Sequence, residues 1–358
     1  MTNGNITKSF FIVLVVMLVV VFEVVQAQTN TGDDQGTLPR THEGYPDLQG
    51  IWTSATFTPL ERPLSLSGKK FFSEEEASKL HRQLTAEGVD PGSNAFALED
   101  TEARERALYQ ESRGPSYVHY DNALWLTEKN NRKGLSTRRT SLIVEPEDGR
   151  IPELMPEAQA REQQRNETST FLMNNVDPQL FDSYETRTVQ ERCLVWEHEG
   201  PPMLIPGYND NLQIFQNSGH VAILQEMSNN QARIIPMDGR PRIHENIRQW
   251  PGDSRGHWEG DTLVVNTTNF THKTHFKGSS EALRVVERFT MVDPDTISYE
   301  FTVEDSTTWK KPWRVQFPLM RTEGPLYEYA CHEGNHDLTH ILLINQNLEK
   351  MNEGTAEQ

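Results

Sequence analysis

The chain has 358 residues, with 34 lysines and arginines against 52 aspartates and glutamates, which gives a formal net charge of −18 at pH 7. This charge opposes binding to nucleic acid and to anionic membrane surfaces over most of the exterior. The composition therefore predicts no nucleic-acid partner and leaves small molecules and oligosaccharides as expected partners.

The first 27 residues have the composition of a secretory signal peptide. Lys8 precedes an uncharged apolar run from Phe10 to Phe22, and small residues end the segment at Ala27. This run has 13 residues, whereas a membrane-spanning helix needs about 20. We therefore expect cleavage after Ala27 and a secreted or periplasmic protein that is not attached to a membrane.

Residues 28–40 are polar and rich in glycine, which predicts a flexible leader. The next segment, 41–139, is expected to carry surface helices at 71–88 and 98–111. In the first of these, Ser73 and Glu76 match a capping box.

Residues 140–345 change to short β-rich runs at roughly ten-residue spacing, followed by a tail at 346–358. We expect hairpins around Asp148-Gly149 and around Asp238-Gly239. Further strands are expected at 212–217, 220–227, 261–270, 283–292, 296–305 and 313–322. The pattern predicts a mainly β fold, either an antiparallel barrel or a sandwich, with N-terminal helical decoration. The phrase "LQGIWT" resembles the opening motif of lipocalins and favours a lipocalin-like barrel.

Cys193 and Cys331 are the only two cysteines. In an exported protein they are able to form one long-range disulfide, whereas a free buried thiol is the alternative. The sequence alone leaves both possibilities open.

The run "CHEGNHDLTH" places His332 and His336 four residues apart with Glu333 beside the first. This is the H-E-x-x-H spacing of zinc-binding helices and predicts, as one alternative, a metal-dependent hydrolase. Gly334 and Asn335 disfavour a helix between the two histidines. We therefore expect no cofactor, and we interpret the run as a closing strand and turn.

The leading hypothesis concerns the segment 233–258, which is dense in arginine, histidine and tryptophan. Arginines that neutralise a carboxylate would acidify the neighbouring C–H bond, and a histidine or tyrosine would then remove the proton. This chemistry predicts a lyase or dehydratase that acts by β-elimination on a uronate-containing oligosaccharide. The expected catalytic residues are His244, His257, Tyr208 and His332. The expected substrate-binding residues are Arg242, Arg248, Arg255, Trp250 and Trp258.

A non-catalytic barrel that binds a small apolar ligand is the other alternative. It predicts a dry aliphatic cavity with the arginines facing outward, so Arg248 and His257 would lie on the exterior. Nucleophile-elbow, phosphate-loop and dinucleotide-binding motifs are absent from the sequence.

The phrases "GDSRGHWEGDTLVV" and "YEYACHEGN" resemble a family of secreted, largely uncharacterised bacterial proteins. The resemblance extends over most of the chain after the signal segment and implies export. It implies no particular activity. In that family a tyrosine is common at the position of His336, and this departure weighs against the metal alternative.

Overall fold

The computed structural model describes residues 38–56, 58–84, 137–163, 183–206, 210–228, 232–273 and 276–356. The chain divides into two compact units, Met1–Pro39 and Arg40–Gln358, and the fold below is that of the second. The expected signal peptide and most of the leader, the expected helix at 98–111 and Tyr208 lie outside the described residues.

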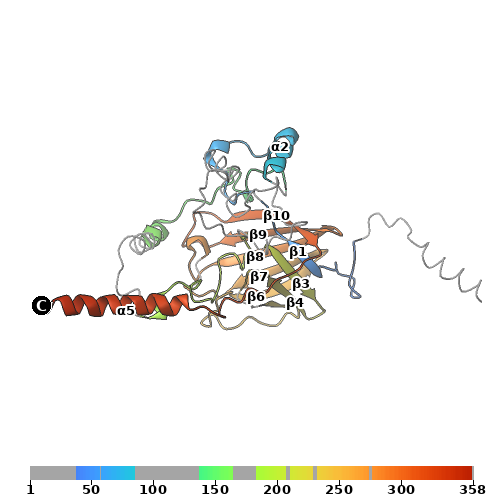
Figure 1. The fold of residues 1–358 in the computed structure, drawn as a ribbon. Helices are drawn as coiled ribbons and strands as arrows, with labels where there is room; N and C mark the ends of the chain where they lie inside the picture. The colour runs from blue at the N-terminus through green and yellow to red at the C-terminus, as the bar shows by residue number, and fades with distance from the viewer. Residues whose placement is uncertain are drawn as a thin grey trace, which may run out of the picture. The chain divides into compact units, whose positions relative to one another are not determined.

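Ten strands form one antiparallel sheet, and nine of them follow each other in the spatial order β5-β4-β3-β1-β10-β9-β8-β7-β6. Figure 1 shows β6 to β10 as successive neighbours. The strands are β1 (Gly50–Thr53), β2 (Ile143–Glu145), β3 (Asn211–Gln216), β4 (His220–Gln225), β5 (Arg233–Pro236), β6 (Asp253–Glu259), β7 (Thr262–Thr268), β8 (Arg284–Asp293), β9 (Thr296–Glu304) and β10 (Trp313–Thr322). The tenth strand, β2, pairs with β10 beside this path.

The two ends of this path, β5 and β6, approach each other and nearly close the sheet into a barrel. The guanidinium of Arg233 on β5 donates to the hydroxyl of Ser254 on β6 at 3.1 Å. Gly256 of β6 packs against Ile235 and Met237 so closely that a side chain at this position would collide with them. β5 and β6 are therefore joined by side-chain contacts, and they do not pair through a ladder of backbone hydrogen bonds.

Alternate residues of each long strand fill the barrel interior. On β9 the inward residues Ile297, Tyr299 and Phe301 are completely buried, and on β10 Val315 and Leu319 are as well. Tyr299 packs against the rings of Phe289 on β8 and Phe317 on β10 at centroid distances of 4.9 and 5.1 Å. The alternation predicted from the sequence is confirmed, and large side chains occupy the interior of this barrel.

The barrel is confirmed and the sandwich is not formed, but both predicted hairpins are wrong. Residues after Gly149 and after Gly239 do not return as paired strands. Pro152 and Pro241 lack the N–H groups that a returning ladder needs. The short β2 pairs with β10 instead, and β5 pairs with β4. The sheet also begins before the boundary expected at Thr140, because β1 lies between β3 and β10.

The described helices are α2 (Glu74–Leu84), α5 (Asp337–Ala356), a helical segment at 156–163, and the 3-10 turns η1 (Leu64–Leu66), η6 (Tyr184–Thr186) and η7 (Phe276–Gly278). The capping box of α2 is confirmed: the N–H of Glu76 donates to the Ser73 hydroxyl at 3.2 Å, and the Ser73 N–H donates to the Glu76 carboxylate at 2.8 Å. The Lys69 ammonium and Ser73 lower the pKa of Glu76 to about 2.

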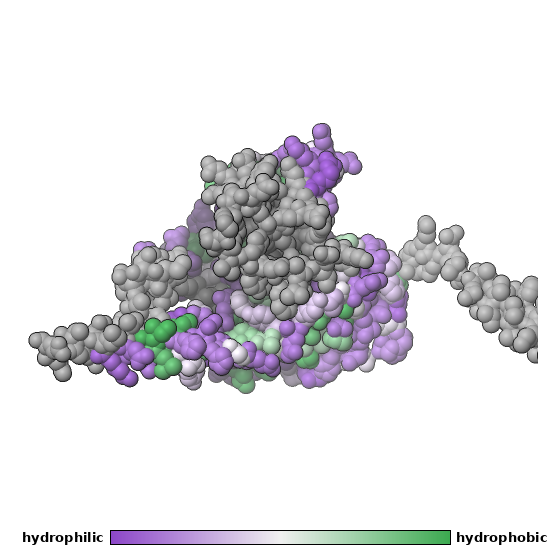
Figure 2. Space-filling view, in the orientation of Figure 1, coloured by the Kyte–Doolittle hydropathy of each residue, from purple (hydrophilic) through white to green (hydrophobic). Residues whose placement is uncertain are grey.

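The C-terminal region differs from the expected closing strand and tail. An irregular connection follows β10, and α5 then begins at Asp337. Gly334 has a φ of 73°, a left-handed conformation that separates His332 from the helix. None of the described helices combines the length and apolar character that a bilayer crossing requires. Where the visible face is coloured in Figure 2, hydrophilic residues predominate and apolar residues form smaller patches.

Candidate ligand-binding site

Residues 183–206, which we name the cover segment, lie over one end of the barrel. Strands β6 and β8 begin and β7 ends at this end, which we name the mouth. The segment opens with η6 and continues through turns. Thr188 and Glu191 bond to each other's backbone N–H groups at 2.9 and 3.2 Å, a local cap that holds this turn.

A disulfide between Cys193 and Cys331 ties the cover segment to the connection after β10. Cys193 is 1% exposed, so the bond is part of the packed structure. The Asn335 amide strengthens the same junction by donating to the Glu191 carbonyl at 3.2 Å. The structure thus decides in favour of the disulfide, which is compatible with an oxidising compartment.

Further along the cover segment, the ring of His198 bonds the Met227 carbonyl at 2.8 Å. Burial lowers the pKa of His198, so the neutral ring donates its N–H to this carbonyl. The Glu197 carboxylate accepts from the Lys277 ammonium at 3.1 Å. These contacts fix the segment on both sides of the mouth.

A buried polar network beneath the cover segment also positions it. The hydroxyl of Tyr299 accepts from the Met203 N–H at 2.9 Å and donates to the Glu287 carboxylate at 2.8 Å. Glu287 is completely buried and pairs with both terminal nitrogens of Arg233. Burial and then the Glu287 charge raise the pKa of Tyr299 well above its usual value, so its proton stays in place.

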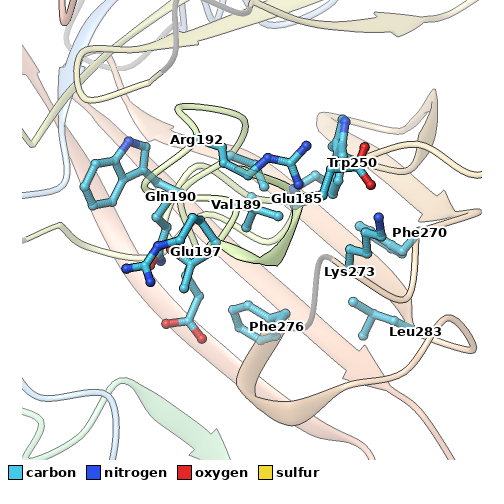
Figure 3. A pocket seen from close by; sticks show the side chains of 16 residues that line it. Glu185, Val189, Gln190, Arg192, Glu197, Trp250, Phe270, Lys273, Phe276 and Leu283 are labelled. Atoms are coloured by element: carbon cyan, nitrogen blue, oxygen red, sulfur yellow. The ribbon is translucent and has the colours of Figure 1, made fainter. Parts of the chain in front are cut away.

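Between the cover segment and the barrel lies a cavity of about 440 Å³, which we name the mouth cavity. Its apolar walls include Val195, Trp196, Trp250, Phe270, Phe276 and Leu283. Figure 3 shows Phe276 and Leu283 along one side, with Trp250 and Phe270 nearby. A volume of this size and a largely apolar lining are typical of small-molecule sites.

A second, smaller cavity of about 60 Å³ adjoins the first and shares Val195, Gly200 and Trp250 with it. It reaches Arg233, whose guanidinium is already paired with Glu287. The mouth cavity therefore extends toward the packed barrel interior, and Trp250 lies where the two spaces meet.

Charged side chains surround the mouth cavity: Glu185, Arg187, Arg192, Glu197 and Lys273. Two of them are neutralised by partners outside the lining, because Arg187 pairs with Glu191 at 2.5 Å and Glu197 pairs with Lys277.

The arginines predicted to bind substrate lie outside the lining of the mouth cavity. Arg242 donates to the Asp253 carbonyl at 2.7 Å, and Arg255 donates to the Asp253 carboxylate at 2.5 Å. Arg248 is exposed and donates to the Glu281 carbonyl at 3.0 Å. Each of these guanidinium groups thus holds a loop or strand in place.

The predicted histidines do not converge either. His244 is exposed and accepts from the Asn246 N–H at 3.2 Å, while His257 faces outward from β6 and contacts Glu259 at 3.2 Å. His332 is exposed in the turn after the disulfide. Their predicted catalytic roles, like that of Tyr208, stay predictions.

The two predicted tryptophans lie at opposite ends of β6. Trp250 precedes the strand and lines the mouth cavity. Trp258, near the other end of the strand, stacks on Tyr45 with ring centroids 4.9 Å apart. Among the members of the predicted set that the structure describes, only Trp250 lines the mouth cavity.

Among the described residues, no group of three or more histidine, cysteine, aspartate or glutamate side chains is arranged to hold a metal ion. His332 lies in the turn, whereas His340 lies on α5 with its ring centroid 6.3 Å from that of His336. The H-E-x-x-H spacing therefore does not place His332 and His336 on one helix.

A pair of acidic residues is buried at the same end of the barrel, where β3 begins and β4 ends. Asp210 and Glu226 are 4% and 2% exposed. Glu226 accepts from the Tyr327 N–H at 3.1 Å. Burial above all, with the neighbouring Asp210 charge, raises the pKa of Glu226 to about 7. This carboxyl therefore titrates near neutral pH beneath the connection that carries Cys331.

Several residues of this site were not singled out in the sequence. Val189, Arg192 and Lys273 belong to stretches without regular periodicity, and Cys193 was the one available signal for the cover segment. A cysteine whose partner lies 138 residues away marks a place where distant parts meet. Comparison of the chain with protein-family models, curated proteins and solved structures finds no match.

Proposed function

We propose that this protein is exported and binds a small molecule with a flat apolar body in the mouth cavity. The observation that carries the proposal is a cavity of about 440 Å³ with aromatic and aliphatic walls, lined on one side by the cover segment. The binding alternative predicted a dry aliphatic cavity, whereas this cavity is largely aromatic with charged residues around it. It also predicted an outward position for Arg248 and His257. Both side chains are exposed.

Anchoring of the cover segment favours a preformed site. The disulfide, the His198 contact and the Met203 contact fix it at three separate points. A preformed cavity binds its ligand without a large cost for ordering the protein. Export is supported by the composition of residues 1–27 and by the disulfide.

The lyase hypothesis stays a prediction. Elimination requires a base and a carboxylate-binding group in contact with one substrate. His244, His257 and Arg255 lie outside the mouth cavity, as does the exposed His332. Incubation with uronate oligosaccharides, followed by absorbance of a conjugated double bond, tests it directly.

The test of binding uses the fluorescence of N-phenyl-1-naphthylamine, a neutral aromatic probe, with the disulfide-bonded protein. We expect saturable binding and a loss of about tenfold in affinity for Trp250→Ala, because the ring supplies a large apolar wall. Trp258→Ala is the matched control, since Trp258 lies at the far end of β6. Equal loss in both variants, or no saturable binding, would contradict the proposal.

A further inference from the structure

The charges around the mouth cavity do not cancel. Arg187 and Glu197 are paired with Glu191 and Lys277. The lining charges that lack an ion-pair partner among the described residues are Arg192, Lys273 and Glu185. These three residues carry two positive charges and one negative charge, so they give the mouth cavity a local net positive charge in a chain whose net charge is −18.

Both cations have geometry suited to an incoming ligand. Arg192 lies over the ring of Tyr184 at 5.4 Å, which supports its planar group without using its N–H donors on a carboxylate. Lys273 comes from the loop after β7 and is exposed. Figure 3 shows the two side chains coming from different segments toward the part of the cavity that contains Trp250.

Solvent access explains why these cations are tolerated without a carboxylate partner among the described residues. A partly exposed guanidinium or ammonium keeps water as its partner, so the empty site is not strained. A ligand oxygen that replaces this water gains a charge-assisted hydrogen bond, which is stronger than one between neutral groups. The walls beside these cations, Trp250 and Phe270, are apolar and reduce competition from solvent.

We propose that the ligand is an aromatic carboxylate whose ring lies against Trp250 and whose carboxylate is held by Arg192 and Lys273. This inference rests on the proposed binding function and adds the ligand's charge. It also assigns specificity to two residues outside the arginine-rich segment 233–258.

The experiment compares two probes of equal size, 2-naphthoate and 2-naphthamide, as competitors of bound N-phenyl-1-naphthylamine. For the unaltered protein at low salt we expect naphthoate to bind about tenfold more tightly than naphthamide, as the gain of a hydrogen bond between charged groups implies. High salt should reduce this ratio, because rim charges are screened.

Variants then assign the preference to its residues. Arg192→Gln and Lys273→Gln should each lower the naphthoate-to-naphthamide ratio by about threefold, and together they should bring it close to one. Arg192→Lys, which keeps the charge but loses the planar donors, should retain part of the ratio. The matched control is Glu185→Gln, which removes the opposing charge and should raise the ratio.

The outcomes separate this inference from the binding function itself. If N-phenyl-1-naphthylamine binds and Trp250→Ala weakens it, but naphthoate and naphthamide compete equally, the charge assignment is wrong and the binding function stands. Tighter binding of 2-naphthylmethylamine than of naphthoate would also overturn it, because Glu185 would then dominate. If the neutral probe itself does not bind, the binding function fails.

Discussion

Cationic side chains on the outer wall and at the mouth of this barrel have different partners. On the outer wall, Arg242 and Arg255 converge on Asp253. Arg248, in the loop before β6, also uses its donors within the chain, on the Glu281 carbonyl. At the mouth, Arg192 and Lys273 have no carboxylate partner among the described residues. The dense arginine segment fastens loops to strands, whereas the sparse cations at the mouth use none of their donors on a described carboxylate.

This contrast shows that the local density of a residue type is a weak guide to a site. An arginine whose donors are all used on its own chain contributes to the fold, and a ligand that recruited it would have to break those bonds. An arginine beside an apolar cavity, with no internal partner, offers its donors at little cost. Four experiments test whether the mouth and the outer wall differ in this way, in order of decreasing effect.

Removal of the disulfide should have the largest effect. Cys331→Ser removes a crosslink between two residues that are 138 positions apart in the sequence. Loop-closure entropy for such a crosslink predicts a decrease of about 5 kcal/mol in the free energy of unfolding. Urea denaturation under non-reducing conditions measures this loss. The probe should also bind more weakly, since the cover segment loses an anchor. The double variant Cys193→Ser/Cys331→Ser should have the same free energy of unfolding as Cys331→Ser alone. A urea midpoint equal to that of the unaltered protein would contradict the anchoring role of the disulfide.

Breaking the buried pair beneath the mouth comes next. Glu287→Gln leaves the Arg233 charge buried without its carboxylate, and we expect a loss of about 3–5 kcal/mol in urea denaturation. The outer-wall control is Glu145→Gln, whose carboxylate pairs with Arg314 at an exposed position and should cost about 0–1 kcal/mol. Similar losses at both positions would remove the distinction between interior and outer wall.

The contribution of Glu226 to the pH dependence of the free energy of unfolding should be smaller than the loss expected for Glu287→Gln. Its folded pKa of about 7 lies above the usual 4.5, so the protonated form stabilises the fold. This contribution is complete below pH about 4.5 and is lost as the pH rises through 7. Since one pKa unit corresponds to about 1.4 kcal/mol and solvent screening reduces the full value, we expect about 2 kcal/mol.

Glu226→Gln tests this sign, because its neutral amide does not titrate. The difference in free energy of unfolding between the variant and the unaltered protein should shift in favour of the variant from pH 5 to pH 8. Unfolding measured at several pH values gives this difference. A constant difference over that range would show that Glu226 is ionised in the fold throughout.

Substitutions of exposed residues outside the lining of the mouth cavity should have the smallest effect on binding. His257→Gln and Arg248→Gln should leave the affinity for N-phenyl-1-naphthylamine unchanged, because both side chains are exposed and lie outside the mouth cavity. Fluorescence titration of each variant gives the result. A tenfold loss in either variant would restore the segment 233–258 as the binding region.

Much of the fold could be predicted from the sequence. Alternation in runs such as 296–305 predicts both the strand and its buried face, because side chains along a strand point alternately to opposite sides. The capping box at Ser73 and Glu76 depends only on neighbours in sequence and is correct. The hairpin predictions failed because a turn at Gly149 or Gly239 fixes the reversal of the chain but not the partner of the next residues.

The candidate site could be predicted only in part. Trp250 was identified from its place in an aromatic and basic segment, but the same reasoning chose Trp258, which lies at the other end of β6. Arg192 and Lys273 carry no local signal, since their importance depends on the absence of a partner in space.

The sequence by itself determined the chain's net charge, the alternation of most strands and the local capping of α2. These properties depend on composition or on residues a few positions apart. The tertiary structure decided that Cys193 joins Cys331, that β5 meets β6, and which of the described cations pair with a described carboxylate. Those outcomes depend on which distant segments approach each other, and the packing of the whole barrel sets that approach.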